Sequence, residues 1–387
     1  MTPTQSVTKV FQDKFGSQSL LVIAPGRINL IGEHTDYNNG YVMPAAVDKC
    51  IAFAVALNGS DQCNFYSIDF NTSFSFKLSE LVPGASWFHY MMGVADGFLK
   101  MGLPIAGINC VFGGNIPTGA GMSSSAALCC GIAYAFNELF YLKLSRLQLA
   151  KLAQRAEHEF AGVRCGIMDQ YASLFGEANS ALLLDCRSLT HEILPINFID
   201  AEILLIDTKV KHELGSSAYN ERRAACEEGV HQLQKLKPAI QSLRDVQATD
   251  LIILKPKVQP DVFIKCQFIV NEINRTLEAA QLIKANDLAG FGKKMFETHW
   301  GLSRDYEVSC AESDLLVQLA QDSGDGVLGA RQMGGGFGGC TINLVKKQAI
   351  EKYTDHIKKK YVASFKKEPD FYSIDLCEGV HIVKAIT

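Results

Sequence analysis

The stretch that decides the fold is GGNIPTGAGMSSS, residues 113–125. An apolar run from Ile105 to Phe112 precedes it, and an apolar, alanine-rich run from Ser123 to Phe140 follows it. The pattern therefore predicts a strand, a glycine-rich loop and a buried helix, in that order. Glycine is frequent where the backbone turns through positive φ or approaches a ligand closely. Because a helix N-terminus offers free N–H groups and the positive end of the helix dipole, this segment predicts a phosphate site.

An ordinary tight turn before a capped helix is the alternative for this loop. The spacing of Gly114 and Gly119 is that of a Walker A loop, but Ala120 stands where that motif places its lysine. A phosphate here would therefore be held by backbone amides, hydroxyl groups and a metal ion.

A second glycine cluster, GGGFGG at residues 334–339, matches the G-x-G-x-x-G spacing of dinucleotide-binding proteins. That fingerprint must follow a strand and open a helix, whereas here a predicted strand, Cys340 to Val345, follows the cluster. The context excludes an NAD site. A flexible hairpin loop is the other interpretation of this cluster.

The segment PGRINLIGEHTDYNNG, residues 25–40, follows a short apolar strand at residues 20–24. Glu33, His34 and Asp36 are close together in it, and neither an alternating nor a helical pattern is present, so we expect a loop. Carboxylates accept hydrogen bonds from hydroxyl groups and imidazole can donate or accept, which suits a polyol ligand. A solvated surface loop is the alternative.

A third segment, RAEHEFAGVRCGIMDQ at residues 155–170, places acidic residues at the end of one helix and near the start of the next. Asp169 lies between Met168 and Gln170, in apolar surroundings. An ionisable group in such surroundings costs free energy unless it is paired, so Asp169 is a candidate base or metal ligand. A helix N-cap is the simpler interpretation.

Composition narrows the class of protein. The 387 residues carry 37 Lys and Arg against 41 Asp and Glu, a formal net charge of −4, which disfavours a nucleic-acid partner. The longest apolar run, Ala126 to Phe136, is too short to span a bilayer, so no membrane association is expected. Met1 to Gln12 lacks the apolar core of a signal peptide, and the 12 cysteines show no C-x-x-C pair. We expect buried, unpaired cysteines and a cytoplasmic location.

The order of predicted elements lacks regular βαβ alternation, which favours the α+β class. The length favours two domains, and we place the boundary near residue 195, giving domains 1–195 and 196–387. Expected strands lie near 20–24, 41–57, 106–112, 180–186, 202–208, 340–345 and 375–385, and expected helices near 88–101, 123–140, 146–160, 215–236, 262–285, 287–300 and 347–362.

Together these segments resemble the GHMP small-molecule kinase family, and within it the kinases of galactose. The resemblance covers most of the chain, and residues 26–38 match the galactose-kinase signature almost position for position. The other matching stretches are Pro117–Ala127, similar to the family's phosphate loop, Gly334–Cys340, similar to its third motif, Glu157–Gln170, and Lys211-His212-Glu213-Leu214 through Tyr219-Asn220-Glu221-Arg222.

The resemblance implies two α+β domains with the active site in the cleft between them, and ATP-dependent phosphorylation of the galactose C1 hydroxyl. It implies that Asp169 is the catalytic carboxylate beside Arg27, and it leaves open whether Asp169 removes the proton or positions the hydroxyl. The implied sugar contacts are Glu33, His34, Asp36, Gly166, Asp169 and Tyr219. The implied ATP contacts are Gly119, Ala120, Gly121, Met122, Ser123, Ser124 and Ser125. The implied Mg²⁺ ligands are Glu157 and one serine of residues 123–125, with Ser124 and Ser125 preferred to Ser123.

Two other functions stay open from the residues. One is a kinase of a related sugar such as N-acetylgalactosamine or arabinose, since the sequence does not give the room around C2 and C6. The other is a galactose- and ATP-binding sensor without catalysis, but such relatives lack part of the serine-alanine run that is intact at residues 123–127. By analogy with the family we expect a monomer whose partners are galactose and ATP.

Overall fold

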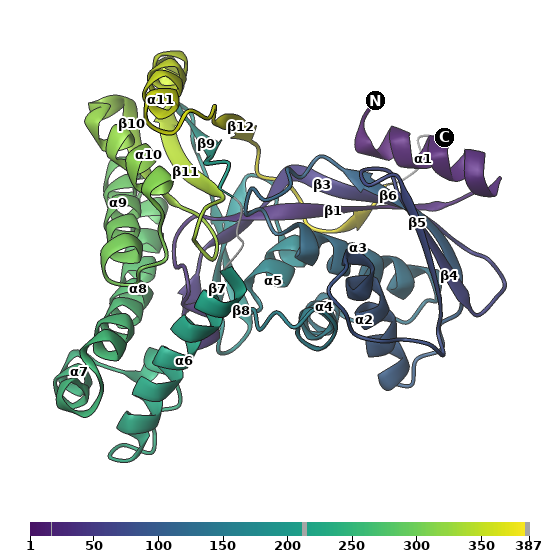
Figure 1. Cartoon of the computed structure of the whole chain (residues 1–387), viewed down its shortest axis with the longest axis horizontal. Coiled ribbons are helices and arrows are strands. Elements are labelled where there is room, and N and C mark those ends of the chain that lie inside the picture. Colours follow the sequence, from purple (N-terminus) through teal and green to yellow (C-terminus); the bar gives the residue numbers. More distant parts are fainter. Residues whose placement is uncertain (17, 211–214, 384–387) are drawn as a thin grey trace.

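Three β-sheets organise the described part of the chain, residues 1–16, 18–210 and 215–383 of a computed structural model (Figure 1). The first sheet has the order β13-β1-β3-β6-β4-β5, the second β10-β11-β9-β12 and the third β2-β7-β8. The strands are β1 (Leu20–Asn29), β2 (Tyr41–Val42), β3 (Pro44–Leu57), β4 (Gln62–Ser67), β5 (Thr72–Lys77), β6 (Ile108–Gly114), β7 (Ser180–Asp185), β8 (Thr190–Pro195), β9 (Ala201–Asp207), β10 (Val327–Gln332), β11 (Cys340–Lys346), β12 (Asp370–Ile374) and β13 (His381–Ile382).

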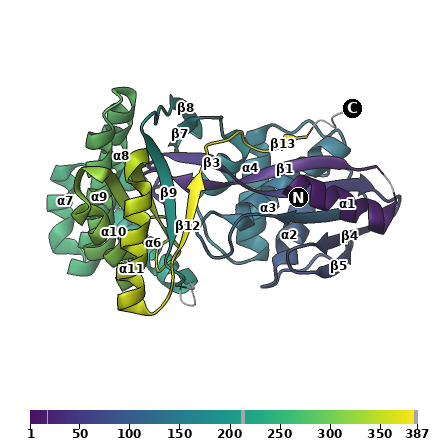
Figure 2. The same cartoon turned by 90° about the horizontal axis from the view of Figure 1, so that it is seen from above.

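The helices lie mainly against the first two sheets, and in both views the first sheet with α1–α4 occupies one end of the molecule while α7–α11 occupy the other (Figure 2). The α-helices are α1 (Pro3–Phe15), α2 (Trp87–Lys100), α3 (Ser124–Leu139), α4 (Arg146–Phe160), α5 (Met168–Phe175), α6 (Gly215–Gln234), α7 (Ala248–Leu254), α8 (Pro260–Lys284), α9 (Leu288–Arg304), α10 (Ala311–Asp322) and α11 (Ile350–Phe365).

The first sheet is covered on both faces because side chains alternate along β3. Ala52 and Ala54 point to one face, where they pack against Val7 and Phe11 of α1. Phe53 and Val55 of β3 belong to the larger core on the other face, which α2, α3 and α4 complete. Both faces of the sheet are therefore apolar, with small side chains of β3 under α1 and larger ones under α2, α3 and α4.

The second sheet is antiparallel throughout and is also packed on both faces. Leu205 on β9 contributes to a core with Phe291 and Met295 of α9, and this core also holds Ile28 of β1. The next residue, Ile206, faces a separate core built with α10 and α11. The apolar contact of Ile28 with the α9 core joins the two ends of the molecule.

The α+β class is confirmed, and the expected strands and helices are found with three differences. The segment from Pro25 to Asn29, expected as a loop, continues strand β1, because its backbone pairs with β3. The strand expected near 41–57 is interrupted at Met43. The strand expected near 375–385 is reduced, in the described residues, to β13 at His381–Ile382, and residues 211–214 of the resemblance lie outside the described residues.

Several elements have no counterpart in the sequence prediction: α1, α7, α10, β4, β5, β8, β10 and β12. No helix in the described ranges is both long and apolar enough to cross a membrane. All 12 cysteines are free; eight are buried, as the sequence predicted, and the other four are half-buried.

Candidate active site

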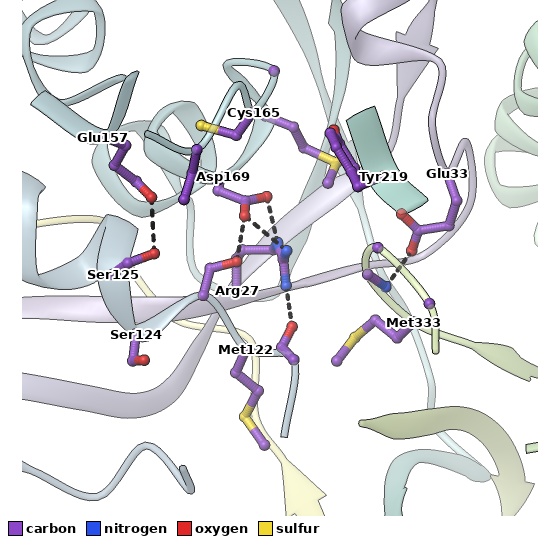
Figure 3. A pocket seen from close by; sticks show the side chains of 18 of the residues that line it. Arg27, Glu33, Met122, Ser124, Ser125, Glu157, Cys165, Asp169, Tyr219 and Met333 are labelled. Atoms are coloured by element: carbon purple, nitrogen blue, oxygen red, sulfur yellow. Dashed lines mark hydrogen bonds and ion pairs between the residues drawn. The ribbon is translucent and has the colours of Figure 1, made fainter. Parts of the chain in front are cut away.

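A cavity of about 460 Å³ lies between the two ends of the molecule, and it collects the predicted segments (Figure 3). Its walls come from β1 and the loop after it, the loop before α3, the segment between α4 and α5, the start of α6, and the hairpin between β10 and β11. Of the residues predicted to contact ligands, the cavity is lined by Arg27, Glu33, His34, Asp36, Gly119, Gly121, Met122, Ser123, Ser124, Ser125, Glu157, Gly166, Asp169 and Tyr219.

Arg27 and Asp169 form a two-pronged ion pair in this cavity. Arg27 Nε donates to Asp169 Oδ1 at 2.8 Å and Nη2 donates to Oδ2 at 2.9 Å. The Arg27 side chain is 5% exposed and that of Asp169 is 24% exposed, so the carboxylate is the partner that faces the open space. A planar guanidinium that bonds both oxygens fixes the orientation of the carboxylate. Figure 3 shows the pair at the centre of the cavity.

Local backbone structure aims Arg27 at Asp169. The register between β1 and β3 shifts between Pro25 and Arg27, and such irregularities redirect side chains. The Arg27 amide donates to the Met122 carbonyl at 3.1 Å, and a Cβ at Gly26 would lie 2.8 Å from the same oxygen. A glycine at residue 26 therefore lets the loop before α3 approach the strand.

The loop before α3 has the backbone that a phosphate site requires. Gly119 and Gly121 have φ of 81° and 73°, which is the left-handed region that favours glycine. The side chains of Ala120 and Met122 are buried in the core below, so this loop faces the cavity chiefly with its backbone; Ala120 itself does not line the cavity. Among the described residues, no acceptor is found for the amides of residues 121–125. They form an electropositive cradle at the start of the helix.

The structure separates the three serines, among which the sequence did not firmly choose a metal ligand. Ser123 has a left-handed φ of 55° and makes no N-cap hydrogen bond; its hydroxyl donates to Asp169 Oδ2 instead. Ser124 is exposed, and Figure 3 shows it apart from both acids. Ser125 Oγ donates to Glu157 Oε2 at 2.9 Å.

Glu157 is a buried carboxylate near the end of α4. Its Oε2 is the oxygen that accepts from Ser125, and its Oε1 accepts from Gln170 Nε2 at 2.5 Å. Burial raises the pKa of Glu157 to about 7, and the hydrogen bonds from Gln170 and Ser125 oppose this rise. A nearby cation would favour the charged form. The described residues contain no cluster of three or more His, Cys, Asp or Glu side chains suited to a metal, so a cation here would depend on hydroxyl, carboxylate and ligand oxygens.

Asp36 and Gly166 form the opposite wall and are in close contact. A Cβ added to Gly166 would lie 1.7 Å from Asp36 Oδ2, so no larger residue fits there without moving the carboxylate. Burial, and then the charge of Asp169, raise the pKa of Asp36 to about 7. Binding groups that donate hydrogen bonds to Asp36 would stabilise its ionised form.

Glu33 is enclosed by a residue that sequence reasoning missed. Arg331 on β10 is fully buried, and its Nη1 donates to Glu33 Oε1 at 2.8 Å. The same oxygen accepts from the Gly334 amide at 2.9 Å. Glu33 thereby ties the first motif to the second glycine cluster, which the structure shows to be the hairpin loop between β10 and β11. An arginine within a short strand gave no sequence signal for this contact.

Other cavity residues were also absent from the predicted contacts. Most of them add apolar and backbone surface to the cavity. The glycine cluster at residues 334–339 was noted in the sequence, but the sequence did not place it at the cavity. These residues are Ile116, Pro117, Gly162, Val163, Arg164, Cys165, Met168, Asn220, Met333, Gly334, Gly335, Gly336 and Phe337.

Three family models match the chain in the regions that build this cavity. They are described as "GHMP kinases N terminal domain" at residues 89–177, "Galactokinase galactose-binding signature" at residues 9–57 and "GHMP kinases C terminal" at residues 279–363. Fold and site therefore define the class as that of the GHMP kinases.

Comparison with curated proteins and solved structures narrows the class. The chain is 42% identical to a galactokinase of Thermotoga neapolitana over 93% of this chain and 99% of that protein, and 41% identical to a galactokinase of Chloroflexus aurantiacus over 89% and 88%. It matches the crystal structure of Lactococcus lactis galactokinase complexed with galactose with a TM-score of 0.94 and 33% identity, covering 98% of this chain and 99% of that one. The mevalonate kinase of Methanococcus jannaschii, with a TM-score of 0.64 and 18% identity over 94% of this chain and all of that one, shares the fold. The chain belongs to the galactokinase family.

Proposed function

We propose that the chain transfers the γ-phosphoryl group of ATP to the C1 hydroxyl of D-galactose, giving α-D-galactose 1-phosphate and ADP in galactose catabolism. The observation that carries the proposal is the Arg27–Asp169 ion pair. It faces a cavity whose other wall is a helix N-terminus, and the amides there have no acceptor in the part of the chain that the structure describes. A sugar hydroxyl at Asp169 and a phosphate at the amides would be neighbours. Phosphoryl transfer needs this positioning and charge stabilisation more than covalent help from the protein.

Asp169 and Arg27 are the proposed catalytic residues. Asp169 accepts the hydrogen bond of the C1 hydroxyl through the oxygen face that Arg27 leaves open to the cavity. Arg27 holds the carboxylate in one orientation, and its positive charge stabilises negative charge that develops on the transferred group. Comparing Asp169→Asn, which keeps an acceptor oxygen, with Asp169→Ala, which removes it, separates proton removal from positioning of the hydroxyl.

The sugar contacts are proposed on the side of the cavity opposite the phosphate loop. Asp36 accepts from the C3 and C4 hydroxyls, while Glu33, His34, Gly166 and Tyr219 complete the wall. Because Gly166 already touches Asp36, the carboxylate has little room to follow a hydroxyl that points elsewhere. A site built for the axial C4 hydroxyl of galactose rejects the C4 epimer, glucose, because binding of glucose would leave buried polar groups unpaired.

ATP is proposed to place its phosphates on the amides of Gly119 to Ser125, with Mg²⁺ held by Ser125 and Glu157. The two side-chain oxygens are 2.9 Å apart. Adjacent ligands of an octahedral Mg²⁺ at 2.0–2.1 Å are separated by about 2.9 Å, so this pair fits the ion. When bound, Mg²⁺ neutralises phosphate charge. In the described part of the chain Ser124, the other serine proposed for the metal, lies apart from Glu157 and Asp169, and the Ser123 hydroxyl donates to Asp169.

We further propose a cytoplasmic, monomeric enzyme whose two domains meet near residue 195, at the end of β8. The position fits the start of β9 in the second sheet at Ala201. Strand β13 nevertheless returns to pair with β1, so the last strand of the described residues belongs to the first sheet.

The proposal is tested by ADP release in a coupled assay with galactose, glucose, N-acetylgalactosamine, arabinose and mevalonate. We expect the highest kcat/KM on galactose and near-complete loss of it in Asp169→Ala. A hundredfold preference for another sugar would replace galactose as the substrate. If the chain turned over none of the five compounds but still bound galactose and ATP, the proposed catalytic function would be wrong and a sensor would be favoured.

A further inference from the structure

A chain of hydrogen bonds runs from the cavity wall into the protein interior. His34 Nδ1 and the Tyr37 hydroxyl are 2.9 Å apart, and the Tyr37 and Tyr306 hydroxyls are 2.8 Å apart. The Tyr306 hydroxyl is 3.4 Å from Cys226 Sγ. These residues come from the first motif, the turn after α9, and α6. Neither tyrosine lines the cavity, whereas His34 does.

The other nitrogen of His34 makes no hydrogen bond of good geometry among the described residues, although the Gly335 backbone is close enough to oppose in part the lowering of the ring's pKa by burial. His34 is 4% exposed, and its Nε2 is a buried polar atom that makes no hydrogen bond there. Leaving such an atom unpaired costs free energy, so a ligand atom is the expected partner. Burial lowers the pKa of His34 to about 4, so the ring is neutral at neutral pH. A neutral imidazole carries one proton, and its position decides whether Nε2 donates or accepts.

The two directions of the hydrogen-bond chain are not equivalent. In one direction the Cys226 thiol donates to Tyr306, Tyr306 donates to Tyr37, and Tyr37 donates to His34 Nδ1. In the opposite direction His34 donates and the chain ends at the sulfur of Cys226. An imidazole nitrogen is a good acceptor and a thiol sulfur a weak one, so the first direction is favoured. Hydrogen bonds in such a chain also polarise one another.

The surroundings of Nε2 favour the same direction. The described cavity lining holds four carboxylates, those of Glu33, Asp36, Glu157 and Asp169, against two arginines, Arg27 and Arg164. An N–H dipole that points toward a region with excess negative charge is favourable, and a lone pair in that position is not.

We propose that Tyr306, acting through Tyr37, fixes His34 in the Nε2–H tautomer and so makes it a hydrogen-bond donor to one oxygen of the sugar. The identity of the ligand rests on the proposed function. Tyr306 is a positioning residue, since it touches neither the cavity nor the reacting atoms. A donor at this point complements Asp36, which only accepts when ionised, and the two together read both the lone pairs and the protons of the sugar hydroxyls.

The tautomer is measured on the free wild-type chain with ¹⁵N-labelled histidine. We expect a protonated, pyrrole-type Nε2 and an unprotonated Nδ1 for His34, assigned by comparison with His34→Gln. In Tyr306→Phe, which keeps the ring that packs on His34 at a centroid distance of 4.9 Å, we expect a mixture of the two tautomers. A wild-type ring protonated on Nδ1 overturns the inference, whether or not the variant folds.

Kinetics test the consequence for binding. We expect Tyr306→Phe to raise the galactose KM about three- to tenfold, as loss of orientation by one hydrogen bond would, with kcat and the ATP KM changed less than about twofold. The matched control is Tyr353→Phe, because Tyr353 is also buried and donates to Asn343 Oδ1 at 2.9 Å away from the cavity. Equal effects of the two variants would overturn the inference.

Deoxygalactoses locate the sugar oxygen. Among 2-, 3-, 4- and 6-deoxygalactose, we expect the effect of Tyr306→Phe on KM to disappear for the one sugar that lacks the oxygen bonded by Nε2. The same effect on all four contradicts a role through His34. A wild-type chain that phosphorylates no galactose defeats the proposed function instead, and the tautomer measurement on the free chain still decides the direction of the hydrogen bonds.

Discussion

Two arginine–carboxylate pairs flank the same cavity and differ in what surrounds them. In the Arg27–Asp169 pair the carboxylate is 24% exposed, whereas in the Arg331–Glu33 pair the two side chains are 0% and 2% exposed. Asp169 bonds Arg27 and Ser123 and keeps an open face. In Glu33, by contrast, Oε1 accepts from both Arg331 and the Gly334 amide.

The difference teaches that a charged pair can serve chemistry or architecture with the same residue types. An open face lets a carboxylate receive a hydroxyl, at the cost of incomplete pairing when the site is empty. An enclosed pair has no such freedom, but removing one partner leaves an uncompensated buried charge. Substitution should therefore affect turnover at the first pair and stability at the second.

The largest effect is expected for Asp169→Asn. Loss of the negative charge removes the ion pair with Arg27 and the carboxylate proposed to receive the C1 hydroxyl, so kcat should fall by about 10²–10⁴. The circular dichroism spectrum should be retained, because Asp169 lies at the cavity surface. A variant that keeps a tenth of wild-type kcat would show that the open pair has no catalytic role.

Arg331→Met breaks the enclosed pair. We expect a loss of about 3–5 kcal/mol in the free energy of unfolding, since Glu33 would stay buried without its cation. Urea unfolding measures the loss, and the double variant with Glu33→Gln should recover part of it. A loss below about 1 kcal/mol would remove the distinction between the two pairs.

Gly166→Ala tests the cavity-facing carboxylate Asp36. The new Cβ would overlap Asp36 Oδ2, so the galactose KM should rise at least about tenfold, with a smaller change in the ATP KM. Gly326→Ala is the control, because Gly326 lies outside the described cavity lining and its Cβ would meet Ala349 Cβ, at 3.0 Å, so we expect less than about a twofold change in the galactose KM. Similar changes in both variants would contradict the contact.

The smallest effect is the pH dependence contributed by Asp36. Its pKa is raised from 3.8 to about 7 in the folded chain, so the folded state holds a proton that the unfolded state releases. This contribution to stability is present below pH 3.8 and is lost as pH rises through about 7. Relative to Asp36→Asn, the wild type should lose about 1–2 kcal/mol between pH 4 and pH 8, after screening in the open cavity. A constant difference would contradict the shifted pKa.

The parts of the fold that sequence predicted are those with long, regular apolar patterns. The buried helix after the glycine loop and the apolar strand before it lie where expected, as α3 and β6. Several missed elements are short or atypical: β10 contains Gly329 and the buried Arg331, and β4 and β5 are only six residues each. Two missed helices, α1 and α10, are longer, at 13 and 12 residues. Arg27 was placed in a loop because pairing with β3, a tertiary contact, is what makes its segment a strand.

The candidate site, like the fold, has one part that the sequence predicted and another that only the structure decided. By itself the sequence determined the motifs, their family and the candidate residues, because phosphate loops and sugar signatures depend on contiguous residues whose types and spacing are local properties. Only the tertiary structure decided which serine meets which acid, that Arg331 encloses Glu33, and that Tyr306 reaches His34 through Tyr37. These contacts join residues from 32 to 298 positions apart, and no local pattern encodes them. They exist because the packing of separate sheets and helices brings hydrogen-bonding groups together where water is excluded.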